Sequence, residues 1–439
     1  MQTMHGLFRI NDSLTNKISF YHLVLLMASL PFNMFYSHLI LISYTVHTLI
    51  HLNRSNIKPF FKLRTFALQS VFFITLFSTI YSINRDGAFN EWGKQITILI
   101  IPLLFCLNPL DLKKYRDQLF MAFSLVCTVT IACLYADAFI TIKHYHLPAL
   151  NIFTGAFTNH NFSLPIDIHA TFFSMQVLLA LVYMLSVLTT EKKLLNKVIY
   201  LMCSLILTAG LIQLSSKAIF IVSIIAVNAA FPWFLLKGRA RLKFILGSAA
   251  LFAVIAFGIW NMGAFRERYI NELKLDMAAP TIGETSDSRL ARWGVTMELI
   301  KKSPVIGYGA GSEIGLLQDG FFNKKLYDSY LNRLNTHSEY LSITLKSGLI
   351  GLLVYLGTLA FGFTISFRKK DLLFFTFMLL IAAVSFSENL LDVDKGIIFY
   401  AFFFTFFTFS SEIKKQVFVE GVMKASSQKP EEYSLELMK

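Results

Sequence analysis

Charged residues are scarce in this chain. Lysine, arginine, aspartate and glutamate make up 15% of its 439 residues, whereas hydrophobic residues make up 55%. That balance excludes the two or three soluble domains that a chain of this length would otherwise suggest. Apolar runs of about 20 residues, long enough to cross the hydrocarbon core of a bilayer, recur along the sequence instead. Lipid offers backbone groups no hydrogen-bond partner, so these runs are predicted to be helices.

Cysteine is scarce as well, and its placement argues against a disulfide framework. The four cysteines, Cys106, Cys127, Cys133 and Cys203, all lie within apolar runs, where small packing residues are expected. The sequence contains neither an HExxH nor a CxxC motif, so no metal site is predicted. It also carries no internal repeats and no low-complexity tracts. No cofactor is expected.

The apolar runs predict about twelve membrane-spanning helices, and the expected fold class is an all-α polytopic membrane protein. The residues up to about Asn16 are polar and lack a small-residue cleavage site, so the first run is predicted to be a retained helix. The predicted centres lie near Leu26, Ser43, Ile74, Pro102, Thr130, Leu178, Leu207, Ala226, Phe252, Val354, Leu379 and Phe404.

Lysine and arginine gather in alternate connections between the predicted helices. One set of connections, together with Arg9 and Lys17 before the first run and Lys414 and Lys415 after the last, holds 21 of them, and the opposite short loops hold only Arg85, Lys94, Lys143, Lys217 and Lys395. The positive-inside rule places the first set and both termini in the cytoplasm. The net charge of +13 is therefore interpreted as a signal of topology and not as a nucleic-acid footprint.

Two longer connections fall on the predicted outer side. Residues 143–167 are rich in histidine, asparagine and proline, and residues 263–339 carry ten basic and ten acidic residues. Within the second connection, RLARWGVTMELIKKS has apolar residues at helical spacing, and Ser303-Pro304 predicts its end. The predicted organisation is an N-terminal membrane region (1–262), a large, partly helical periplasmic loop (263–339), a C-terminal membrane region (340–411) and a cytoplasmic tail (412–439).

Arg289 and Arg292 are the first candidates for chemistry. They lie three residues apart at the start of a predicted helix, so they share a face. Guanidinium groups match phosphate oxygens bidentately and stay charged at any working pH, which favours anion binding. The structural alternative is a solvated helix face, or ion pairs with Asp287 or Glu298.

His337 is the second candidate, and it lies in NTHSEY directly before an apolar run. An imidazole at the boundary between water and membrane suits a general base, with a structural histidine as the alternative. Pairing with Glu339 is not expected, because helix positions i and i+2 do not face each other. The glycine-rich segment 307–315 follows a helix and a proline instead of a strand. It is interpreted as a flexible turn and not as a dinucleotide loop.

Further polar residues are predicted at the same outer level, beside apolar helices. Lys217 opens one predicted helix and could either hold a lipid phosphate or act as a snorkelling anchor. Ionisable groups in such places are costly unless they face partners or a cavity, so a shared polar cavity is expected. Its predicted members are Asp167, His169, Asn335, Glu388, Asn389, Asp392 and Asp394.

These residues together resemble the O-antigen ligase and polymerase superfamily of bacterial inner-membrane proteins. The resemblance rests on a pattern along residues 286–351. An arginine-bearing helix is followed by a Ser-Pro and glycine turn, a polar stretch, an Asn-x-His and a helix with Gly-Leu-x-Gly. In this chain these are Arg289, Ser303-Pro304-x-x-Gly307-x-Gly309, Asn335-x-His337 and Gly348-Leu-Ile-Gly351.

The resemblance implies a metal-independent, inverting glycosyltransferase that uses an undecaprenyl-diphosphate-linked glycan at the periplasmic face. By position, Arg289 would bind the donor diphosphate, Arg292 would assist it, and His337 would act on the acceptor hydroxyl. Lys217 stands where the family often has an arginine; lysine keeps the charge but loses the bidentate fork. The implied partners are the lipid-linked donor, a lipid A-core or second lipid-linked glycan acceptor, and membrane lipid, with no nucleic acid.

Several functions stay open at this point. A ligase moves a finished glycan to lipid A-core, a polymerase joins lipid-linked repeat units, and a relative could glycosylate proteins, all with the same motifs. A transporter is the alternative from another class, because twelve helices with both ends inside are common there. Against it, the two halves show no matching pair of broken helices. A prenyl-linked donor needs a groove open to lipid, which the phenylalanine-rich spans are expected to provide.

Overall fold

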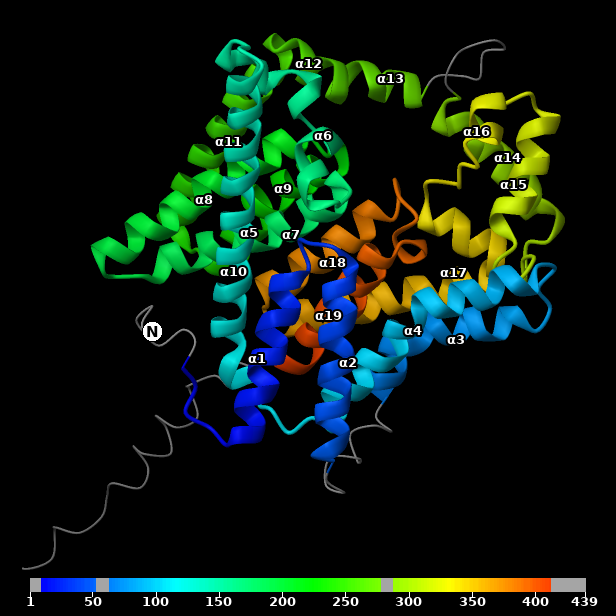
Figure 1. Cartoon of the computed structure of the whole chain (residues 1–439), viewed down its shortest axis with the longest axis horizontal. Helices are drawn as coiled ribbons and strands as arrows, with labels where there is room; N and C mark the ends of the chain where they lie inside the picture. The colour runs from blue at the N-terminus through cyan, green and yellow to red at the C-terminus, as the bar shows by residue number, and fades with distance from the viewer. Residues whose placement is uncertain (1–8, 53–62, 278–286, 412–439) are drawn as a thin grey trace, which may run out of the picture.

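The computed structural model describes residues 9–52, 63–277 and 287–411, and every regular element in these ranges is a helix (Figure 1). Each of the twelve predicted centres lies on a helix. The helices that hold them are α1 (Leu14–Ser29), α2 (Met34–Ile50), α3 (Leu63–Thr79), α4 (Arg85–Leu107), α5 (Leu112–His144), α7 (Ala170–Thr190), α8 (Leu194–Leu214), α9 (Lys217–Ile225) continued through η7 (Ala226–Ala230) and α10 (Phe231–Leu235), α11 (Gly238–Asn261), α17 (Glu339–Arg368), α18 (Leu372–Val384) and α19 (Asp394–Ser410).

Six of these helices are long and apolar enough to cross a membrane: α5, α7, α8, the continuous α9–α10 helix, α11 and α17. Three more, α2, α3 and α18, are apolar but shorter. The prediction of an all-α membrane protein is therefore confirmed. The count of twelve crossings, the domain boundaries and the cytoplasmic place of the termini stay predictions, and the predicted tail 412–439 lies outside the described residues.

Phenylalanine forms the core of the helix bundle. The side chains of α19 are buried almost from end to end, and α19 packs against α4, α5 and α18. Phe374 of α18 stacks on Phe407 of α19 with ring centroids 5.3 Å apart and an angle of 12° between the rings. Helices in lipid associate through packing of this kind, because lipid tails are as apolar as the side chains. The phenylalanines of α19 therefore pack inside the bundle.

The apolar surface open to lipid lies instead on helices at the edge of the bundle. Only 6% of the most apolar stretch of α11 is buried, compared with 83% for α7. Helix α11 packs against η7 and α10, and in Figure 1 its end leads into the short helices α12 (Gly263–Arg266) and α13 (Glu272–Asp276). These two helices are joined through the π-helical turn η8 (Glu267–Asn271).

The second part of the long connection forms a separate small unit. It contains α14 (Arg289–Lys302), α15 (Glu313–Asn323) and α16 (Tyr327–Leu331). Ser288 caps α14 by accepting a hydrogen bond from Ala291 N at 3.2 Å, and the helix ends at Ser303, as the sequence predicts. Seven buried side chains, six from this unit and Leu345 from α17, form its hydrophobic cluster: Ala291, Val295, Ile300, Leu317, Phe321, Leu326 and Leu345.

The glycine turn after α14 packs tightly into a break in α17. Gly348 has a φ of 64° inside that helix, so the helical hydrogen bonding is interrupted there. Gly309 N donates to Lys346 O at 2.8 Å, and Leu349 N donates to Pro304 O at 2.8 Å. A side chain at Gly307 or Gly348 would meet backbone atoms across this contact. The turn is therefore a close-packed brace, and the interpretation as a flexible turn was wrong.

Candidate functional site

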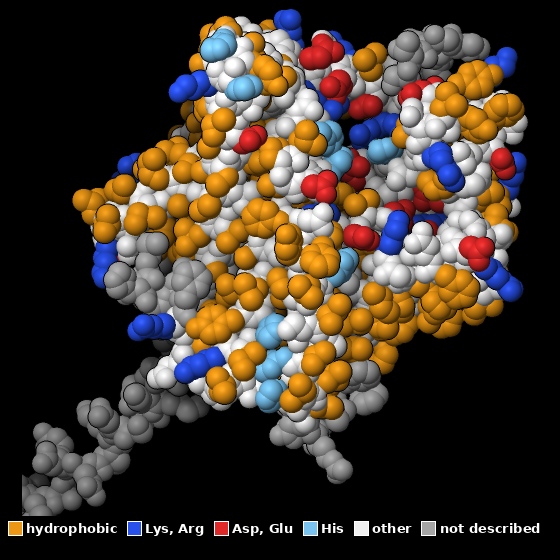
Figure 2. Space-filling view, in the orientation of Figure 1, with side chains coloured by type: hydrophobic (Ala, Val, Ile, Leu, Met, Phe, Trp, Pro, Cys, Tyr) orange, Lys and Arg blue, Asp and Glu red, His pale blue; other side chains and the backbone are white. Residues whose placement is uncertain are grey.

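Lys217 and Arg289 meet at one carboxylate. Lys217, the first residue of α9, lies 3.2 Å from Asp276 Oδ2, and Arg289 Nε lies 3.6 Å from Asp276 Oδ1. Lys217 is also 3.4 Å from Glu272 Oε2, which in turn pairs with Arg268 one helical turn earlier. Two residues that lie far apart in the sequence thus share a partner at the end of α13. In Figure 2, charged and histidine side chains gather in the region between α12–α13 and the α14–α16 unit.

Arg292 lies one turn after Arg289 and is 6% exposed. Its Nε and Nη1 atoms are buried without a hydrogen-bond partner. Burial, together with the positive charge of Arg289, lowers the pKa of Arg292. Buried N–H groups of a cation are costly to leave without hydrogen-bond partners. The guanidinium is thus able to take an anion at little further desolvation cost.

His337 lies in the connection between α16 and α17, in a left-handed backbone conformation with a φ of 46°. Asn335 Oδ1 accepts a hydrogen bond from His337 N at 3.0 Å. The imidazole Nδ1 lies 3.5 Å from Glu388 Oε2, longer than an ordinary hydrogen bond. A ring whose Nδ1 faces a carboxylate keeps its proton on that nitrogen, which leaves Nε2 as the free acceptor.

Residues 387–389, between α18 and α19, connect the cations to the histidine. Arg289 donates through Nη1 to Ser387 O at 3.1 Å, and the next residue, Glu388, faces His337. Burial alone would raise the pKa of Glu388, but His337, aided by His169 and Arg289, brings it below the usual value. Glu388 is therefore an anion at neutral pH. Contacts run without a break from Lys217 through Asp276, Arg289 and residues 387–389 to His337.

Not all predicted cavity residues join this group. His169 caps α7, its ring centroid lies 4.0 Å from that of His160, and its charge acts on Glu388. Asp167 instead accepts a hydrogen bond from Asn33 at 3.3 Å, beside the connection between α1 and α2. The Glu339 carboxylate accepts a hydrogen bond from Leu391 N at 2.8 Å. This agrees with the expectation that Glu339 does not pair with His337.

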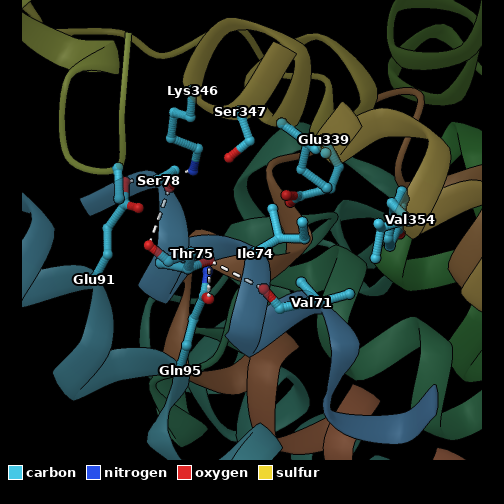
Figure 3. A pocket seen from close by; sticks show the side chains of 14 residues that line it. Val71, Ile74, Thr75, Ser78, Glu91, Gln95, Glu339, Lys346, Ser347 and Val354 are labelled. Atoms are coloured by element: carbon cyan, nitrogen blue, oxygen red, sulfur yellow. Dashed lines mark hydrogen bonds and ion pairs between the residues drawn. The ribbon is translucent and has the colours of Figure 1, made fainter. Parts of the chain in front are cut away.

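Sequence reasoning missed Glu272 and Asp276, the acidic residues that pair with the cations, and a buried lysine near the site. Lys346 of α17 is 5% exposed and lies 2.8 Å from Asp392, 3.4 Å from Glu91 and 3.9 Å from Glu313. It borders a pocket between α3, α4 and α17 (Figure 3). A lysine within an apolar run is itself a signal, because membrane helices keep charges only where partners face them. Glu272 and Asp276 repeat at helical spacing after Arg268, which was also readable in the sequence.

One comparison with known proteins gives a match. Residues 201–356, 156 of the 439 residues, match the family model described as O-antigen ligase. This match supports the O-antigen ligase and polymerase superfamily. The matched residues include Lys217, Arg289, Arg292 and His337 but end before residues 387–389. None of the curated proteins matches the chain. The family implies a membrane protein with glycosyltransferase-type activity on lipid-linked glycans.

Proposed function

We propose that this protein transfers a glycan from undecaprenyl diphosphate to a hydroxyl group of lipid A-core, at the periplasmic face of a bacterial inner membrane. The observation that carries the proposal is the meeting of Arg289 and His337 at residues 387–389. Transfer from a diphosphate needs cations at the leaving group and a proton acceptor at the incoming hydroxyl. Both groups contact one short segment here, residues 387–389.

On the donor side, Arg289, Arg292 and Lys217 bind the diphosphate. Negative charge grows on the diphosphate as the bond between the anomeric carbon and the phosphate oxygen breaks, and fixed cations stabilise it. Arg292 is preorganised for this role, because two of its nitrogen atoms are buried without partners. A diphosphate-linked sugar is already activated, so this chemistry requires no separate energy-carrying cofactor.

On the acceptor side, His337 acts as the general base. The acceptor oxygen forms its bond to the anomeric carbon from the face opposite the diphosphate, which inverts the anomeric configuration. Its proton passes to Nε2 of His337, and the negative charge of Glu388 stabilises the imidazolium that results. The 3.5 Å separation between Nδ1 and Glu388 is expected to shorten as the substrates bind, as is common for catalytic contacts.

Glycan analysis of a deletion strain tests the proposal and separates the ligase from the polymerase. Free lipid A-core with accumulated lipid-linked polymer is the result expected for a ligase. Single repeat units on lipid A-core would indicate a polymerase instead. Purified protein that moves the lipid-linked glycan across a vesicle membrane without forming a new glycosidic bond would contradict both and support a transporter.

Substitution of Arg289 tests the donor site directly. We expect Arg289→Ala to abolish transfer in a purified assay and Arg289→Lys to restore only part of it, because lysine replaces a two-pronged contact by one point charge. Arg241→Ala is the matched control: Arg241 binds backbone carbonyls of the α10 end, namely those of Pro232 and Leu236. Near-normal transfer by Arg289→Ala, at equal protein level in the membrane, would contradict the assignment.

A further inference from the structure

The side chain of Asn389 uses its whole hydrogen-bonding capacity. It is 2% exposed and follows Glu388 directly. Its Oδ1 accepts from Ser338 N and from Thr336 Oγ1, both at 2.9 Å. Its Nδ2 donates to Glu313 Oε1 at 2.9 Å and to Asp392 Oδ2 at 3.0 Å. An amide has two acceptor positions and two N–H donors, so every one of them is occupied.

The two groups that Asn389 accepts from lie on either side of His337. His337 has a left-handed backbone, a conformation that a residue other than glycine keeps only where its surroundings impose it. Asn335 holds the amide of His337 itself. Asn389 holds the residues before and after it. The direction of the imidazole is therefore set by contacts outside the histidine.

The two groups that Asn389 donates to are fixed in turn. Glu313, at the start of α15, also accepts from Thr336 N at 3.0 Å. Asp392 lies 2.8 Å from Lys346, which reaches from α17 into the pocket where Glu91 also lies (Figure 3). A neutral amide is suited to this place, because it can accept from the histidine loop and donate to two carboxylates at once. Aspartate would add a third carboxylate, and leucine would leave the partners buried and unsatisfied.

From these contacts we infer that Asn389 is a positioning residue, which sets the ring of His337 against Glu388 and the acceptor hydroxyl. The inference rests on the transfer function proposed above and extends it to a residue beyond the matched range, 201–356. Asn389 does not touch substrate. It acts through His337. Asn389 holds the loop that carries the histidine, and the preceding residue, Glu388, faces the imidazole ring.

The test is a double-mutant cycle with purified protein in lipid nanodiscs and lipid-linked glycan as donor. We expect Asn389→Ala to lower kcat about 10- to 100-fold, the loss that a small displacement of a catalytic group causes. The KM for the donor is expected to change less than about twofold, because Arg289 binds a backbone carbonyl and not this amide. In a His337→Ala background, Asn389→Ala is expected to cost less than about twofold more, since its target is gone.

Asn108→Ala is the matched control. Asn108 is also buried, and its amide donates to Ser19 Oγ and Thr48 Oγ1, both at 3.0 Å, far along the chain from His337. It is expected to lower thermal stability and leave kcat nearly unchanged. If Asn389→Ala does not reach the membrane, Thr336→Val carries the test. That substitution keeps the shape and removes the hydroxyl that donates to Asn389 and also bonds to the backbone of Ser338, with a smaller loss of kcat expected in the same direction.

Two results would overturn the inference. One is an equal loss of kcat from Asn389→Ala with and without His337. The other is a kcat that stays within about twofold of the Asn108→Ala control. Neither result touches the proposed function, which fails separately if His337→Ala and Arg289→Ala both transfer glycan normally.

Discussion

At the scale of single residues, the partner of His337 is chosen by tertiary structure. Glu339 is the nearest acidic residue in the sequence, yet its carboxylate accepts from Leu391 N. Glu388, from the connection between α18 and α19, faces the ring instead. The sequence identified Glu388 as a polar group at the outer level of the membrane and Glu339 as a neighbour that is not expected to pair with His337. It could not identify the pair, because contacts between distant loops follow from helix packing and not from spacing.

The charge of Glu388 gives a prediction about pH and stability. His337, His169 and Arg289 face this carboxyl and hold its pKa below the value in the unfolded chain. Ionised Glu388 therefore contributes stability above its unfolded pKa, and this contribution is lost as pH falls through the lower folded pKa. We expect the thermal midpoint of the wild type to fall steeply on acidification below about pH 4.5, and that of Glu388→Gln to fall less.

Asp319→Asn, which changes an exposed carboxylate on α15, is the control for this measurement. It is expected to follow the wild-type curve. If the thermal midpoints of the wild type and Glu388→Gln fell in parallel with pH in the same detergent, the ionised carboxylate would contribute no stability through its three neighbours.

At the scale of elements, α13 forms ion pairs with the cations that are proposed to bind the donor. Asp276 lies between Lys217 and Arg289, so a diphosphate must displace it. We expect Asp276→Asn to bind inorganic diphosphate about 3- to 10-fold more tightly than the wild type, because one partly exposed ion pair is worth roughly 1 kcal/mol. Titration calorimetry of the purified protein measures this affinity directly.

Glu298→Gln is the matched control, since it breaks an exposed ion pair with Lys324, 2.8 Å away on the far side of the α14–α16 unit. No change in diphosphate affinity is expected there. Weaker binding by Asp276→Asn would mean that Asp276 orients the cations for the donor and does not compete with it.

The break in α17 gives a second prediction at this scale. Gly348 has a positive φ, and a side chain there would meet the backbone of Val305 in the glycine turn. We expect Gly348→Ala to lower the free energy of unfolding by about 1–3 kcal/mol through backbone strain, and by more through the collision. The readout is the thermal midpoint of purified protein. Gly357→Ala in the same helix, where a side chain meets open space, is expected to be neutral or slightly stabilising, and an equal loss from both would contradict the brace.

Hydropathy predicted the elements well because membrane helices obey local rules. All twelve predicted centres lie on helices, and α14 begins at Arg289 and ends at Lys302, directly before Ser303-Pro304, as its cap and proline indicate. What the sequence did not predict depends on packing. Composition marked the phenylalanine-rich spans but did not tell which helix is central, and the phenylalanines of α19 form the core. Lys346 was overlooked, although its charge in an apolar run marked it.

At the scale of the whole molecule, the site lies where two parts of one connection meet the membrane helices. The α12–α13 part supplies the acidic residues, and the α14–α16 unit supplies Arg289 and Arg292. Residues 387–389 join them to His337. The family match and the charge pattern of the loops together favour the periplasmic side for this assembly. A lipid-linked donor with its glycan outside the cell membrane can be used only from that side.

Cysteine labelling tests this orientation. Gly320 is a poor position for a probe, because a side chain there would collide with Val295, whereas Gly315 of α15 is exposed and borders open space. We expect Gly315→Cys to react with a membrane-impermeant thiol reagent in intact spheroplasts. Lys192→Cys, in the exposed connection between α7 and α8, is expected to react only after permeabilisation. The unsubstituted protein controls for Cys133, the native cysteine with an exposed side chain. The reverse pattern would place Arg289 and His337 in the cytoplasm, on the wrong side for a periplasmic acceptor, and would contradict the proposed transfer.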